Sequence, residues 1–201
     1  MQKILDEFIQ TKNNSQLCIK YAVGIDTSKD KASRLAKELI INNAFMNVVT
    51  GWEKFLEQSA IAYSLGTVSI KGHLPICYIS PNDEEHANEL IKGAVQYFDW
   101  SNKEQIIKMA ERIFENGEPY KSVIAGINSH LISIKKLRNN IAHNSIKSND
   151  EFNTLVRNEL SPSEVGISTA QFLLSSKSGS SAFWEIYFTH LTNGATQIAN
   201  F

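Results

Sequence analysis

Apolar residues recur at the spacing of an α-helix along most of this chain, and this periodicity limits what the chain can fold into. Two series are especially regular, and the first is followed by Gly66, a residue suited to ending a helix. The series are Phe45, Val48, Val49, Trp52, Phe55, Leu56 and Tyr63, and then Trp184, Tyr187, Phe188, Leu191, Ala195 and Ile198. Because such stripes bury one face of each helix against other helices, we predict an all-α fold, a helical bundle.

Residue pairs typical of helix starts divide the chain into segments. Each combines a serine or threonine with an acid three residues later, as in a capping box. They are Thr27 with Asp30, Ser101 with Glu104, Ser148 with Glu151, and the proline-containing runs 80–83 and 161–164. The first pair predicts a helix through residues 34–40, and the helix after Ser101 should end near Gly117.

Residues 67–79 interrupt the helical pattern. Pro75 disfavours a helix there, and Val68, Ile70 and residues 76–79 are compatible with short extended pieces. A second stretch, residues 175–181, is rich in serine and glycine and predicts a loop. We therefore expect the bundle to carry one short irregular insertion between helices.

Length and charge restrict the organisation and the partners. The 201 residues are consistent with one domain over 1–201, with 1–27 as an N-terminal helical extension and 28–201 as the core. The net charge of −1 predicts no attraction of the whole molecule to nucleic acid, so RNA contact requires a local basic patch. Cys18 and Cys77 form no metal-ligand spacing and indicate free thiols in a reducing compartment. Neither a signal peptide nor a membrane span is expected, so we predict a cytoplasmic protein without membrane contact.

Residues 137–145, Leu-Arg-Asn-Asn-Ile-Ala-His-Asn-Ser, are unusual because they place polar groups within an apolar periodic segment. The segment predicts a helix over about 122–145, in which Arg138 falls about 20° from Ile127, within the apolar stripe, as does Ser145. Burying an unpartnered guanidinium is costly. Arg138 should therefore have a fixed anionic partner or face a crevice or an interface.

His143 lies about 140° from Arg138 on an ideal helix, so the two side chains do not converge on one straight helix. Asn139 is four residues before His143 and can hydrogen-bond the imidazole to fix its tautomer. Two arrangements can bring arginine and histidine together. One is a two-fold dimer in which the same helix from two chains lines a shared cleft, and the other is a break near Asn139 and Asn140.

Arg138, Asn139 and His143 resemble the signature of HEPN domains, which is arginine, a polar residue, a short spacer and histidine. Residues 52–56, 80–87 and 137–145 together are similar to the RiboL-PSP-type HEPN group, over roughly residues 32–199. The resemblance implies a HEPN-like helical bundle, a homodimer and a metal-independent endoribonuclease without cofactor. It also implies a role in toxin–antitoxin, anti-phage or RNA-processing systems, with an antitoxin or defence-system protein as a possible partner.

The residue types suit RNA cleavage on their own chemistry. Histidine exchanges protons near neutral pH, and arginine binds phosphate oxygens with a bidentate fork. Lys135, Lys136 and Lys147 flank the motif and can hold the RNA backbone, and Glu53 and Ser145 are further candidates for supporting roles. Ser145 stands where one HEPN subgroup has a tyrosine modified by AMP, so that control is not expected here.

Two other functional classes remain open from the residues. A non-catalytic HEPN module would bind RNA or a partner protein without cleavage, and a structural helical subunit would do neither. The aromatic side chains of the last helix, Phe183, Trp184, Tyr187 and Phe188, are expected in the core rather than on a base-stacking platform.

Overall fold

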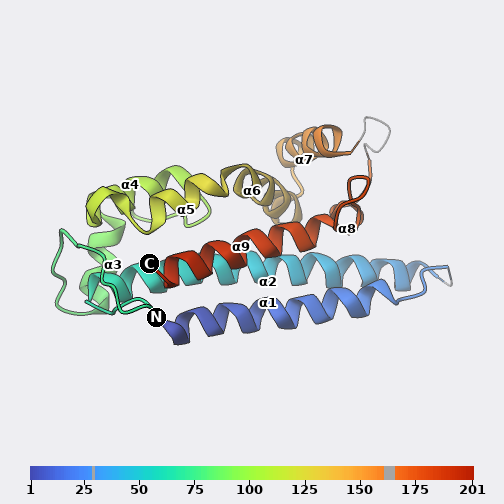
Figure 1. Ribbon diagram of the computed structural model, residues 1–201. Helices are drawn as coiled ribbons and strands as arrows, with labels where there is room; N and C mark the ends of the chain where they lie inside the picture. The colour runs from blue at the N-terminus through green and yellow to red at the C-terminus, as the bar shows by residue number, and fades with distance from the viewer. Residues whose placement is uncertain (29, 161–165) are drawn as a thin grey trace. The chain divides into compact units, whose positions relative to one another are not determined.

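The computed structural model describes residues 1–28, 30–160 and 166–201. Over these ranges the chain is all-α, as predicted, with nine α-helices, a short 3-10 helix and no strand. The helices are α1 Gln2–Val23, α2 Lys31–Ser64, α3 Glu84–Lys92, α4 Lys103–Ile113, η1 Glu115–Gly117, α5 Tyr120–Gly126, α6 Asn128–His143, α7 Ile146–Glu159, α8 Thr169–Leu174 and α9 Phe183–Ala199 (Figure 1). None of the described helices has an apolar stretch that would let it cross a membrane.

The contacts divide the chain into two compact units. The first unit contains Met1–Ile9, Gly51–Leu131 and His190–Phe201, and the second contains Gln10–Thr50 and Ile132–Thr189. Four helices, α1, α2, α6 and α9, therefore contribute residues to both units.

Aromatic side chains form the core of the first unit. Phe8 of α1 packs on Trp52 and Phe55 of α2, with ring centroids 6.1 and 5.9 Å away. Tyr120 at the start of α5 is fully buried, and its hydroxyl donates to the Ser59 hydroxyl at 3.0 Å. Gly194 lets α9 approach closely, because a Cβ there would lie 3.1 Å from the Trp52 ring. The stripe predicted over α2 is thus confirmed as core.

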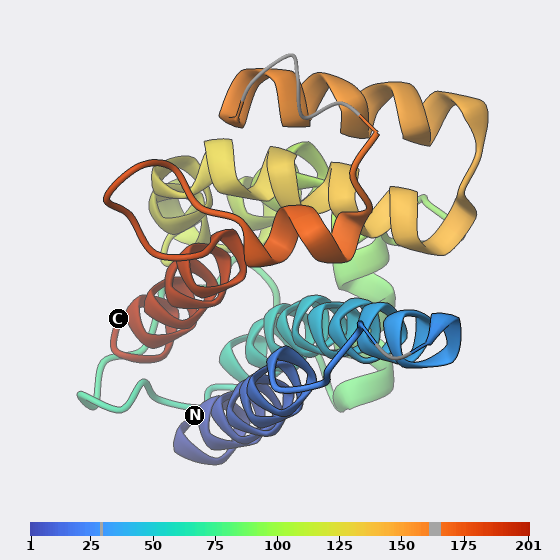
Figure 2. The same cartoon turned by 90° about the vertical axis from the view of Figure 1, so that its right-hand side faces the viewer.

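The second unit has its own aromatic core. Phe45 of α2 stacks on Phe188 of α9, and Phe172 of α8 stacks on Phe183 with centroids 4.5 Å apart. The aromatic side chains of α9 are 2–6% exposed, which confirms that they are core: Phe183, Trp184, Tyr187 and Phe188. In this unit α7 turns back alongside the second half of α6 (Figure 2).

The helix predicted over 122–145 is wrong as one continuous element. α5 ends at Gly126, and Ile127 leaves helical geometry with φ −106° and ψ 14° before α6 begins. Glycine weakens a helix and favours a break at this point. Asn144, with φ of 43°, adopts the left-handed conformation that ends α6 after His143.

Several predicted caps are displaced to neighbouring residues. Asp30, Asp83 and Asn102 accept the first free N–H groups of α2, α3 and α4, rather than Thr27, Ser80 and Ser101. Ser145 forms a capping box with Ser148, whereas the predicted pair was Ser148 with Glu151. α4 ends at Ile113, before the predicted Gly117. The cap is the residue whose side-chain oxygen reaches the free N–H groups of the first turn. The cap predicted at residues 161–164 lies outside the described residues.

The predicted irregular insertion is confirmed between α2 and α3. No helix lies between Ser64 and Glu84, and the extended backbone at residue 77 makes one isolated antiparallel bridge, Cys77 with Phe114. The loop predicted over 175–181 is also confirmed, since α8 ends at Leu174 and α9 begins at Phe183.

Candidate functional site

The motif residues lie on the last turns of α6, in the second unit. α6 is continuous from Asn128 to His143, so the alternative of a break near Asn139 and Asn140 is wrong. A continuous helix keeps Arg138 and His143 on different faces of one chain. His143 is the last helical residue and is exposed to solvent.

Arg138 is half-buried, and its guanidinium has few partners. Its Nη1 donates to the Asn139 Oδ1 at 3.4 Å, the long limit of a hydrogen bond. No carboxylate in the described ranges forms an ion pair with it, so the predicted fixed anionic partner is not found there. A half-buried cation without a carboxylate partner retains its capacity to bind a phosphate.

Asn139 contacts the arginine rather than the histidine. Its side-chain oxygen accepts from Arg138, and no residue that the structure describes hydrogen-bonds the His143 imidazole. The expected bond from Asn139 to His143 is therefore not formed. In this structure Asn139 makes one long contact with the guanidinium, and the imidazole of His143 is exposed to solvent.

Asn140 is a structural contributor that the sequence did not single out. Its Nδ2 donates to the Thr169 hydroxyl at 3.0 Å, and Thr169 is only 6% exposed. Thr169 begins α8, and the adjacent Ser168 both caps α8 and donates to Glu38 Oε1 of α2 at 3.1 Å. These bonds hold the motif turn of α6 against α8. The sequence signal that could have indicated this role is the side-chain amide of Asn140, a polar group within a helix next to the motif.

The supporting residues are placed differently from one another. Ser145 is exposed and caps α7, where its Oγ accepts the Ser148 N–H at 3.2 Å, so it lies off the α6 stripe where it was predicted. Lys135 and Lys136 are half-buried on α6, and Lys147 is exposed on α7. Glu53 belongs to the first unit and has one buried carboxylate oxygen, so its role beside the motif stays a prediction.

The small net charge conceals opposite charges on the two units. The second unit has twelve Lys and Arg against eight Asp and Glu, which gives +4. The first unit has eight Lys and Arg against thirteen Asp and Glu, which gives −5. The motif therefore lies in a unit whose field attracts polyanions.

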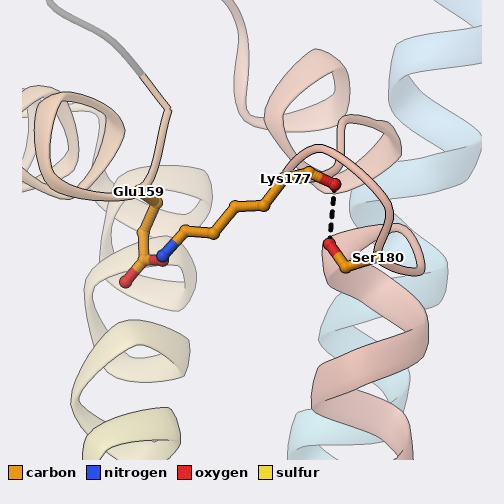
Figure 3. A network of polar contacts seen from close by, with 3 residues as sticks. All are labelled: Glu159, Lys177 and Ser180. Carbon is orange, nitrogen blue, oxygen red and sulfur yellow. Dashed lines mark hydrogen bonds and ion pairs between the residues drawn. The ribbon is translucent and has the colours of Figure 1, made fainter.

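A cavity of about 740 Å³ lies elsewhere in the second unit, lined in part by Glu159, Gln171 and Lys177. Lys177 Nζ pairs with Glu159 Oε2 at 2.7 Å, and the Lys177 carbonyl accepts from the Ser180 hydroxyl (Figure 3). The two charged side chains that line this cavity are thus paired with each other. Among the described residues no three metal-binding side chains cluster.

Comparison of the chain with protein-family models, with curated proteins and with solved structures gives no match. The function of the α6 motif therefore has to be argued from the chemistry and placement of its residues. Within the described residues, the α6 motif combines an arginine that pairs with no carboxylate and an exposed histidine, in a unit of net charge +4.

Proposed function

We propose that this protein is a metal-independent endoribonuclease of the HEPN type. The observation that carries the proposal is the α6 terminus, where no carboxylate of a described residue pairs with Arg138 and His143 is exposed, within a unit of net charge +4. Arg138 supplies a group that binds a phosphodiester, and His143 supplies a group that transfers protons, each on its own face of α6.

The reaction is an internal transesterification of RNA. The ribose 2′-oxygen attacks the adjacent phosphorus and gives up its proton, a bond to the 5′-oxygen breaks, and that oxygen takes up a proton. The products are a 2′,3′-cyclic phosphate and a 5′-hydroxyl. His143 transfers protons, and Arg138, oriented by Asn139, stabilises the charge on the phosphate oxygens. DNA lacks the 2′-hydroxyl and is not cut.

We propose that two chains form each active site. Arg138 and His143 diverge by about 140° on an uninterrupted helix, so arginine and histidine meet only if a second α6 lies alongside. A homodimer through α6 supplies both groups to one cleft, and Lys135, Lys136 and Lys147 then border the RNA path.

A non-catalytic module is the second candidate, and the free imidazole of His143 favours it, since no described residue fixes its tautomer. Such a module binds RNA, or an antitoxin or other defence-system protein, without cutting. It predicts that binding survives His143→Ala and that no new RNA ends appear.

The deciding experiment incubates purified protein with total RNA in EDTA and identifies the fragment ends. Wild type should yield 2′,3′-cyclic phosphate and 5′-hydroxyl ends, and His143→Ala and Arg138→Ala should each abolish them while leaving the circular dichroism spectrum unchanged. His86→Ala, which removes another surface histidine, serves as the matched control and should cleave normally. Cleavage by both motif variants at the wild-type rate would overturn the assignment as a nuclease. A protein that is strictly monomeric at micromolar concentration would overturn the proposal of an active site shared by two chains.

A further inference from the structure

The cavity of about 740 Å³ in the second unit has a volume typical of pockets that bind small molecules, about 300–1,000 Å³. Its walls come from the end of α7, the region that begins α8 and the loop that connects α8 to α9. Glu159 and Leu160 line it from α7, Ile167 and Gln171 from the α8 region, and residues 175–178 from the loop. The lining that the structure describes contains no residue of the α6 motif.

The loop has a defined conformation despite its serine and glycine content. The Phe183 N–H at the start of α9 donates to the Ser175 carbonyl at 2.9 Å and closes the base of the loop. The Ser180 N–H and hydroxyl both donate to the Lys177 carbonyl, at 3.0 and 2.8 Å. The Lys177 side chain extends from the loop to Glu159 of α7, where Nζ and Oε2 are 2.7 Å apart (Figure 3). These contacts hold the loop in place before any ligand binds.

The loop end of the cavity offers hydrogen-bond donors. The N–H groups of residues 176–178 donate to no residue in the described part of the chain, and neither do the two serine hydroxyls of this range. Gln171 Oε1 accepts from the Ser168 N–H at 2.7 Å, which leaves its Nε2 for a ligand. The Lys177 ammonium has three N–H groups, so its ion pair does not exhaust them. Successive backbone N–H groups beside a cation suit a phosphate group.

The other end of the cavity has a different chemistry. Leu160 and Ile167 are half-buried and form an apolar part of the wall, and the Glu159 carboxylate can accept further hydrogen bonds. Figure 3 places Glu159 one extended lysine side chain away from the loop backbone, so the carboxylate is separated from an anion held at the loop. The net charge of +4 on the second unit also favours an anion. A matching ligand therefore carries a phosphate at one end and a partly apolar group with hydrogen-bond donors at the other.

We propose that this cavity binds an organic phosphate monoester of about the size of a nucleoside monophosphate. The phosphate oxygens accept from the N–H groups of residues 176–178 and from Lys177. The organic group lies against Leu160 and Ile167, and its hydroxyl or amino groups donate to Glu159. Binding is non-covalent, and it is independent of the α6 motif and of the proposed RNA cleavage.

The test is a calorimetric titration of the full chain with adenosine monophosphate. Saturable binding is expected, and adenosine, which lacks the phosphate, and inorganic phosphate, which lacks the organic group, should each bind more weakly. Lys177→Gln should weaken the affinity about tenfold or more, because it removes a charged donor. Lys12→Gln removes another exposed or half-buried lysine of the second unit and should leave the affinity unchanged. Arg138→Ala should also bind normally, since Arg138 does not line the cavity.

Nuclear magnetic resonance gives a second readout that does not depend on side-chain replacement. The amide resonances of residues 176–178 should shift as adenosine monophosphate is added, whereas those of Arg138 and His143 should not. The proposal is overturned if adenosine monophosphate fails to bind at millimolar concentration, if adenosine or inorganic phosphate binds as tightly, or if Lys177→Gln has the wild-type affinity. Shifts confined to α6 would also overturn it, because the nucleotide would then bind at the motif instead.

Discussion

Buried hydroxyl groups show how single residues connect the helices of the first unit. Tyr63 is 1% exposed, and its hydroxyl donates to the Ile198 carbonyl at 2.6 Å. Ile198 lies in the last turn of α9, where carbonyls lack a partner within the helix. The tyrosine therefore supplies the shorter of two hydrogen bonds to this carbonyl, since the Phe201 N–H also donates to it at 3.4 Å.

We predict that Tyr63→Phe destabilises the protein by about 1 kcal/mol, because the Ile198 carbonyl loses the shorter of its two hydrogen bonds and keeps only the long one from the Phe201 N–H. Urea denaturation followed by circular dichroism measures the change. Tyr97→Phe is the matched control, since Tyr97 is 79% exposed, and should have no effect. Equal midpoints for the two variants would contradict the role given to this hydroxyl.

Burial also predicts how the protein responds to alkaline pH. It raises the pKa of Tyr63, Tyr120 and Tyr187 above that of an exposed phenol. Below pH about 10, the pKa of tyrosine in an unfolded chain, these phenols are neutral in both states and the protein keeps its full stability. As the pH rises above that value, the unfolded chain releases the phenolic protons while the folded protein retains them, so the folded state loses stability. The variant Tyr21→Phe, Tyr78→Phe, Tyr97→Phe retains only these three tyrosines. As the pH is raised, the phenolate absorbance of this variant should appear together with the loss of helical circular dichroism. Phenolate absorbance that appears while the protein is still fully helical would contradict the prediction.

At the scale of the elements, α6 is positioned by polar bonds as well as by apolar packing. Ile134 and Leu137 are buried, and Asn140 adds the bond to Thr169 of α8. Because Asn140 lies two residues from Arg138 and three from His143, this bond sets the rotation of the motif turn in the second unit.

We predict that Asn140→Ala costs about 1 kcal/mol in the free energy of unfolding, because the Thr169 hydroxyl loses its donor. A double-mutant cycle with Thr169→Val, measured in urea, should give a coupling energy of similar size. Asn47→Ala on the exposed face of α2 is the control and should be neutral or slightly stabilising. Additive effects of the two changes would show that the bond contributes nothing.

At the scale of the whole molecule, the opposite charges of the two units matter more than their sum. A net charge of −1 conceals units of +4 and −5. The charge of the second unit, which carries the motif, therefore favours a polyanion more than the charge of the whole chain does.

We predict that RNA binding weakens with salt and that Lys136→Gln with Lys147→Gln makes the salt dependence shallower. Each lost phosphate contact should reduce the slope of log K against log salt by about 0.7 for single-stranded RNA. Filter binding from low to moderate salt measures the slope. Lys92→Gln with Lys103→Gln removes the same charge from the first unit and should leave the slope unchanged. An equal reduction of the slope in both double variants would contradict an RNA-binding surface located at the motif.

The helical character of the chain and its core faces follow from local sequence. The stripes of α2 and α9 and the loop after α8 were predicted because side-chain periodicity and glycine or serine content act within a few residues. The chemistry of Arg138, Asn139 and His143 was also argued from local sequence, and it stays a prediction.

Tertiary structure decided where helices begin and end and what the motif residues contact. The break at Ile127, the left-handed Asn144 and the caps at Asp83 and Asn102 each required a choice among neighbouring residues of nearly equal local preference. The bond from Asn140 to Thr169 and the bridge between Cys77 and Phe114 join residues distant in sequence. Such contacts depend on how the chain packs, and a local pattern holds no information about them.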